Sequence, residues 1–110
     1  MYSLNYLKEI GKGNDVFVQS VISLFLKDSP KSFSLINEAI QQKDFKSLKL
    51  HAHKLKSSLR ALGADDMAEI CAAIEIEALA ENIENAVILR EKLESGLKEL
   101  TKSLNAYTGK

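Results

Sequence analysis

The sequence of 110 residues is poor in residues that cross-link or interrupt a chain. It contains one cysteine, one proline, five glycines and no tryptophan, and aromatic residues make up 6%. A single cysteine excludes an internal disulfide, and Cys71, which lies among apolar residues, is expected to be a reduced core thiol, as is typical of the cytosol. With so few aromatics, the core must consist mainly of leucine, isoleucine, valine and alanine.

Long apolar runs and an excess of one charge are also missing. No apolar run approaches the roughly 18 residues of a transmembrane helix. The first residues lack the basic and then apolar pattern of a secretory signal. The 15 basic and 15 acidic residues cancel, which argues against a dedicated nucleic-acid binder. We therefore expect a cytoplasmic protein, monomeric and without a membrane or nucleic-acid partner.

The charges are unevenly distributed along the chain. Residues 43–60 hold six basic residues and one acidic residue, whereas residues 65–99 hold ten acidic and three basic ones. The basic segment surrounds the two histidines, His51 and His53. This segment is the candidate for function.

Apolar residues recur at helical spacing throughout, and no region alternates as a strand would. Boundary signals are Asn14, Ser29-Pro30, Asp44, Asp65 and Asn82 at helix starts, with Gly63 at a helix end. They predict helices over about 3–10, 14–28, 30–42 and 44–62, a fifth from 65 and a sixth from 82. Because the connections are short, neighbouring long helices should be antiparallel. The expected fold is a single all-α domain over 1–110, an up-down antiparallel four-helix bundle with one or two additional short N-terminal helices.

The helix over 44–62 separates a buried face from a polar one. At about 100° per residue, one narrow stripe collects its large apolar residues: Phe45, Leu48, Ala52, Leu55, Leu59 and Leu62. His53 points about 130° from the centre of the stripe, toward water. Lys49 and Lys56 lie one turn before and after it, while His51 turns toward the edge of the stripe.

The spacing of the histidines argues against a metal site. His51 and His53 would share a face on a strand, but on a helix their rings point about 200° apart. Helical metal pairs need i,i+3 or i,i+4 spacing, and the chain has neither His-x-x-x-His nor Glu-x-x-His. We expect no metal here.

An exposed imidazole with cations one turn away suits a nucleophile that carries phosphate. Neutral imidazole is well populated near pH 7 and can attack phosphorus directly. The small Ser57 leaves room for the backbone of a partner, and Leu50, at i−3 from His53, offers an apolar docking contact. Lys49 and Arg60 could steer an acidic partner surface.

At this point the sequence resembles a family. The segments Ala52-His53-Lys54-Leu55-Lys56-Ser57-Ser58, Leu62-Gly63-Ala64, and Cys71 with Ile74-Glu75 look like the signature of histidine-containing phosphotransfer (HPt) domains. The segments Tyr6-Leu7-Lys8-Glu9, Gly13-Asn14 and Leu24-Phe25-Leu26, with Phe17 and Pro30, resemble the helices before the motif in HPt domains of hybrid sensor kinases. The resemblance extends to about residue 80.

The resemblance implies a role for each site residue. His53 would be phosphorylated on Nε2, and Lys56 would stabilise the phosphoryl group. Glu75 would hold the Nδ1–H of the ring, which leaves Nε2 free. The family usually has glycine where Ser57 stands. Because serine is also small and is tolerated in helices, we expect function to survive with docking slightly altered.

The function implied is that of a phosphorelay carrier and not of an enzyme. It would pass a phosphoryl group between receiver domains of response regulators and of a hybrid sensor histidine kinase. It would need no cofactor of its own, because the receiver supplies the aspartate and the Mg²⁺. The alternative is a degenerate HPt-like helical module that binds a receiver without phosphotransfer.

Overall fold

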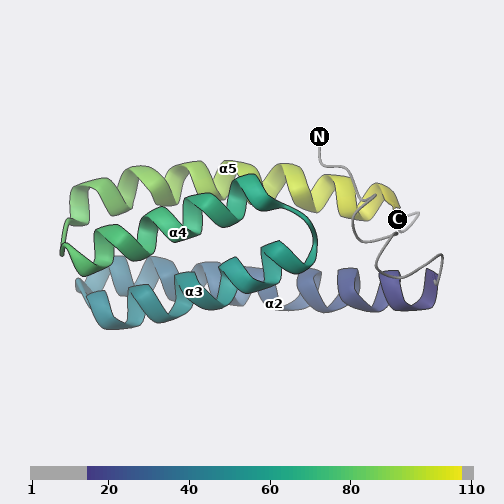
Figure 1. Cartoon of the computed structure of the whole chain (residues 1–110), viewed down its shortest axis with the longest axis horizontal. Helices are drawn as coiled ribbons and strands as arrows, with labels where there is room; N and C mark the ends of the chain where they lie inside the picture. The colour runs from purple at the N-terminus through teal and green to yellow at the C-terminus, as the bar shows by residue number, and fades with distance from the viewer. Residues whose placement is uncertain (1–14, 108–110) are drawn as a thin grey trace.

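The computed structural model describes residues 15–107, which fold into four helices without a strand. They are α2 (Asp15–Gln42), α3 (Phe45–Ala61), α4 (Asp65–Leu79) and α5 (Ile83–Tyr107). Each helix packs against the next, and α2 also packs against α5, so the four helices close into an up-down bundle (Figure 1). The predicted all-α bundle is confirmed. The predicted helix over 3–10 and the Asn14 cap lie outside the described residues.

The predicted boundary at Ser29-Pro30 is wrong, because α2 continues through Pro30 as one helix. Its buried positions stay in helical register on both sides of the proline, from Ile22 before it to Ile36 after it, and Ser29 between them is also buried. A break would interrupt this stripe. Burial of the α2 stripe therefore outweighs the cost of a proline inside the helix. The ring of Pro30 lies on the exposed side of α2. The predicted helices over 14–28 and 30–42 are consequently a single element.

The caps predicted for two helices are confirmed. Asp44 precedes α3, and its carboxylate accepts hydrogen bonds from the backbone N–H of Ser47 at 3.1 Å and from the Ser47 hydroxyl at 2.8 Å. These bonds lower the pKa of Asp44. Asn82 precedes α5, and its Oδ1 accepts the backbone N–H of Asn85 at 3.1 Å. Both side chains satisfy amides that a helix start leaves without partners.

The cap predicted for α4 is displaced by one residue. Ala64 is the N-cap and Asp65 is the first helical residue. The reason is the tight end of α3: Gly63 has a φ of 77°, and the Ala64 N–H reaches back to the Leu59 carbonyl at 2.9 Å. The carbonyl of Ala64 already accepts the first α4 bond. The connection is thus one residue shorter than the sequence suggested.

The core contains the predicted apolar stripes of α3, α4 and α5. Fully buried members include Leu48, Leu55, Leu59, Leu62, Met67, Ile74, Leu93, Leu100 and Leu104. Cys71 is buried among them, as predicted, and burial raises the pKa of its thiol to about 12. This packing fixes α3 and α4 against each other and thereby fixes which of their polar side chains meet at the surface.

Candidate functional site

The structure places the two histidines on opposite sides of α3. His53 is exposed, with 61% of its side chain accessible. His51 is half-buried and lines a small cavity with α2 residues that include Leu35 and Gln42. The helical wheel therefore predicted both positions correctly. No group of three potential metal ligands occurs within residues 15–107.

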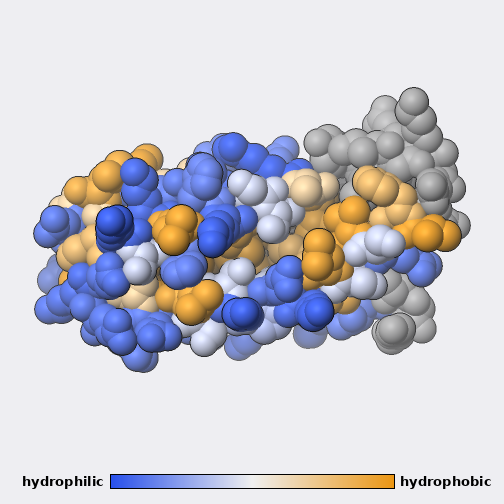
Figure 2. All heavy atoms as spheres, turned by 90° about the horizontal axis from the view of Figure 1, so that it is seen from below, coloured by the Kyte–Doolittle hydropathy of each residue, from blue (hydrophilic) through white to orange (hydrophobic). Residues whose placement is uncertain are grey.

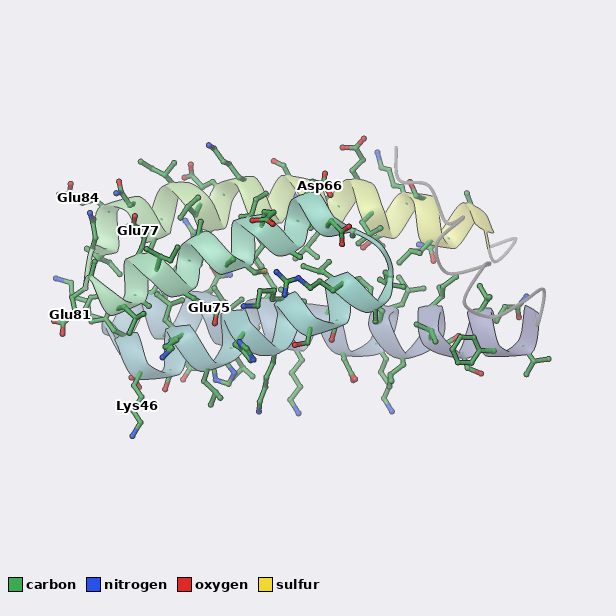
Figure 3. The ribbon with its side chains drawn as sticks, in the orientation of Figure 1. Lys46, Asp66, Glu75, Glu77, Glu81 and Glu84 are labelled. Atoms are coloured by element: carbon green, nitrogen blue, oxygen red, sulfur yellow. The ribbon has the colours of Figure 1, made fainter. Side chains whose placement is uncertain are left out.

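Glu75 joins the His53 ring from α4. Its Oε1 lies 3.0 Å from the Nδ1 of His53, although the two residues are 22 positions apart in the chain. Only 12% of the Glu75 side chain is accessible, and Figure 3 shows it at the seam between α3 and α4. The fold therefore brings together two of the residues that the sequence singled out.

The ionisation of Glu75 decides the direction of this hydrogen bond. Burial raises the pKa of Glu75, but the hydrogen bonds and charges of Lys56 and His53 outweigh it and lower the pKa. Near pH 7 the carboxylate is ionised and can only accept. Nδ1 of His53 must therefore donate, and in the neutral ring the lone pair resides on Nε2.

Lys56 lies on the same carboxylate. Its Nζ is 2.6 Å from Oε2 of Glu75, and 15% of the Lys56 side chain is accessible. The contact is a short ion pair between the ammonium and the carboxylate. The structure thus brings Lys56 to Glu75 and not into open solvent beside the His53 ring.

The other predicted site residues surround His53 on the exposed side of α3. Lys49, Ser57 and Arg60 are exposed, and Leu50 is 50% accessible. The Ser57 hydroxyl donates to the backbone carbonyl of His53 at 3.3 Å. The hydroxyl is therefore engaged with the backbone of α3.

Sequence reasoning missed apolar surface on α4. Ile76 is 64% accessible and Leu79 is 68% accessible. Leu79 lies one turn after Glu75, so it extends the exposed surface beside the site. The helical spacing did contain a signal, because both residues lie off the buried stripe of α4. The sequence of a short apolar helix does not, however, reveal which of its sides other helices cover.

A second apolar area lies far from His53, toward the first residues of α2. Figure 2 shows it at the end of the bundle where α2 begins, while the surface over α3 is mostly hydrophilic. Its exposed members are Val16, Phe17 and Leu24. No helix among residues 15–107 has the length and hydropathy of a membrane span.

Comparison with known proteins finds a family model and several relatives that match the chain. The family model described as "Hpt domain" matches residues 20–106. Pseudo histidine-containing phosphotransfer protein 1 of Oryza sativa subsp. japonica is 30% identical over 92 residues, covering 72% of this chain and 49% of that protein. Histidine-containing phosphotransfer protein 1 of Arabidopsis thaliana is 29% identical over 75 residues, which cover 66% of this chain and 49% of that protein.

A further relative covers more of both chains. Histidine-containing phosphotransfer protein 4 of Arabidopsis thaliana is 28% identical over 96 residues, which cover 86% of this chain and 76% of that protein. The chain spans about half the length of the first two relatives, and no solved structure matches it. Since the family model covers all four helices from residue 20 onward, including the helix of His53 and that of Glu75, the chain belongs to the Hpt domain family.

Proposed function

We propose that this domain carries phosphoryl groups in a phosphorelay, with His53 as the residue that is phosphorylated. The observation that carries the proposal is the contact of Nδ1 with the ionised Glu75, which leaves the lone pair of an exposed ring on Nε2. A neutral imidazole in this tautomer is a competent nucleophile toward phosphorus. Membership of the Hpt family supports the same role.

The proposed transfer is balanced in bonds and charge. Nε2 of His53 attacks the phosphorus of a receiver aspartyl phosphate, an N–P bond forms, and the P–O bond to the aspartate breaks. The aspartate leaves as a carboxylate, and the ring gains positive charge that the Glu75 carboxylate offsets at Nδ1. Transfer to a second receiver reverses these steps and returns the neutral ring.

The partner supplies most of the catalysis in this proposal. Receiver domains, including that of a hybrid sensor histidine kinase, would contribute the aspartate and Mg²⁺, which stabilise the charge of the transferring group. Leu50 and Ser57 would form the contact beside the ring, and Lys49 and Arg60 would attract an acidic receiver surface. We further propose a cytoplasmic monomer, with residues 1–110 as one domain.

The second candidate is a module that binds receivers without accepting phosphate. It draws support from the printed name of one relative, a "pseudo" phosphotransfer protein. The contact of Glu75 with both His53 and Lys56 favours the first candidate, because a binding module has no need of an oriented histidine.

Label transfer tests the proposal. A panel of receiver domains carrying radioactive phosphate is mixed with the wild type, His53→Gln and His51→Gln. The two variants are matched, since both lose a histidine from α3. We expect acid-labile, alkali-stable label on the wild type and on His51→Gln, and none on His53→Gln. Label that survives in His53→Gln, or receivers that bind the wild type without labelling it, would contradict phosphotransfer through His53.

A further inference from the structure

The outward side of α4 exposes large apolar side chains near its C-terminal end. Ile76 is 64% accessible and Leu79 is 68% accessible. Because they are three residues apart on one helix, the two side chains are neighbours and form a short ridge. Ala80, directly after them, is also exposed. We call Ile76 and Leu79 the α4 ridge.

The composition of α4 suits a helix that is covered on more than one side. Ten of its 15 residues are apolar and the other five are acidic, so it has no basic or neutral polar residue. Five of the ten apolar residues are buried in the bundle. A helix that is apolar on most of its circumference is usually enclosed, and exposed apolar area with a charged border is typical of an interaction surface.

The charge that α4 and the start of α5 contribute has one sign. No lysine, arginine or histidine occurs between Arg60 and Arg90. Figure 3 shows three carboxylates at the end of the bundle where α4 turns into α5: Glu77, Glu81 and Glu84. Glu81 and Glu84 are exposed. A partner that covers the α4 ridge would therefore meet negative charge from these two elements.

We propose that the α4 ridge is a docking surface for an amphipathic helix of another protein, whose apolar side is bordered by lysine and arginine. The apolar side of that helix would cover Ile76 and Leu79, as ridges and grooves of two helices pack together. Its basic residues would lie near Glu81 and Glu84 and select the partner by complementary charge. This inference does not depend on the proposed function, since it uses neither the ring of His53 nor its contacts.

A separate protein matches this surface better than a second copy of the chain. A second copy could offer α3, which is basic, but Leu50 is the exposed large apolar residue within Phe45–Ala61. One leucine covers less of the ridge than the whole apolar side of a helix would. The first residue of α2 and the last residue of α5 lie at the opposite end of the bundle (Figure 1).

Titration of the full chain with a designed peptide tests the proposal. The probe is a helix-forming peptide of about 18 residues with leucine on one side and lysine on the other, and its counterpart has glutamate in place of every lysine. Backbone ¹H–¹⁵N spectra locate the peptide. We expect the lysine peptide to shift the amides of Ile76, Leu79 and Glu81, less so at high salt. The glutamate peptide should need at least about tenfold higher concentrations.

Leu79→Ser and Leu24→Ser are matched variants, because each removes an exposed leucine, 68% and 61% accessible. Leu79→Ser should weaken binding of the lysine peptide about tenfold, through the apolar contact that is lost. Leu24→Ser, at the other apolar area, should leave the affinity unchanged. Glu81→Lys combined with Glu84→Lys should reduce the preference for the lysine peptide over the glutamate peptide.

Three results would overturn the proposal. Shifts confined to α3 or to the start of α2 would place the peptide elsewhere. Equal affinity for the two peptides, or for the wild type and Leu79→Ser, would show that the carboxylates or the ridge play no part in recognition. Shifts of Ile76 and Leu79 that grow with protein concentration in the absence of peptide would show that a second copy occupies this side of α4.

Discussion

Replacement of Pro30 by alanine should stabilise the bundle. Pro30 lies inside α2, where it cannot donate the N–H bond to the carbonyl of Leu26, and where its ring crowds that carbonyl. Alanine is about 3 kcal/mol more favourable than proline in a helix interior. The ring also borders a shallow groove with Phe33 and Leu97, and losing this exposed contact costs about 1 kcal/mol or less.

The net gain in the free energy of unfolding is then about 2 kcal/mol. In a domain of this size such a gain raises the melting temperature by about 8 °C. Urea unfolding followed by circular dichroism measures it: the midpoint should rise while the slope with denaturant stays constant. Lys31→Ala, at an exposed neighbouring position, is the control and should change stability by less than about 0.5 kcal/mol.

A Pro30→Ala variant that is no more stable than the wild type would refute the reasoning. It would mean that the helix accommodates the proline without cost, and that burial of the α2 stripe did not have to overcome a penalty. An altered slope with urea would instead indicate a change in the surface exposed on unfolding. In that case the substitution would have changed the compactness of the native or the unfolded state, and not simply removed the cost of the proline.

Three further predictions concern the core, a cap and the thiol. Leu59→Ala should lower the free energy of unfolding, measured in urea, by about 3 kcal/mol, because the side chain is fully buried. Leu50→Ala should lower it by less than about 0.5 kcal/mol. Equal losses would contradict the assignment of Leu59 to the buried face of α3. Asp44→Ala should lower the urea midpoint at pH 7. Because the folded pKa of Asp44 is lowered, its contribution is complete above the unfolded pKa and lost as the pH falls through the folded one. The difference from the wild type should therefore shrink toward pH 3, and a constant difference would count against the cap. Cys71 has a pKa raised to about 12 by burial, so Ellman's reagent at pH 8 should react with it in urea but hardly in the native protein; rapid native reaction would contradict its burial.

Local features of α3 were predictable because they depend on residues within a few turns. The helical period assigns Leu48, Leu55 and Leu59 to one face and His53 to the other, and the structure agrees. The Asp44 cap is equally local, since the acceptor and its amide are three residues apart. Such features follow from backbone geometry and side-chain chemistry alone.

Connections between helices were less predictable. Gly63 has positive φ, as the sequence suggested, but Lys43 and Glu81 adopt the same left-handed conformation at the other two turns, with φ of 54° each. Their side chains make this conformation costly, and a backbone hydrogen bond across each turn, from the Asp44 N–H to the Ala39 carbonyl and from the Asn82 N–H to the Glu77 carbonyl, stabilises it. The predicted helix boundary at Ser29-Pro30 was wrong because burial of the whole apolar stripe decides whether α2 continues, and that burial depends on the packed bundle.

The sequence by itself determined that the chain is helical, that α3 has a buried face, and that His53 and His51 point in different directions, because the helical period alone governs these properties. The resemblance to HPt domains, and not the helical period, pointed to Glu75 as the α4 side chain at the His53 ring, and the tertiary structure alone decided which partner Lys56 takes. Both contacts depend on how α3 and α4 are aligned, and that alignment is set by the packing of their buried residues. Glu75 can therefore meet Nδ1 of His53 and Nζ of Lys56 at once only in the folded bundle.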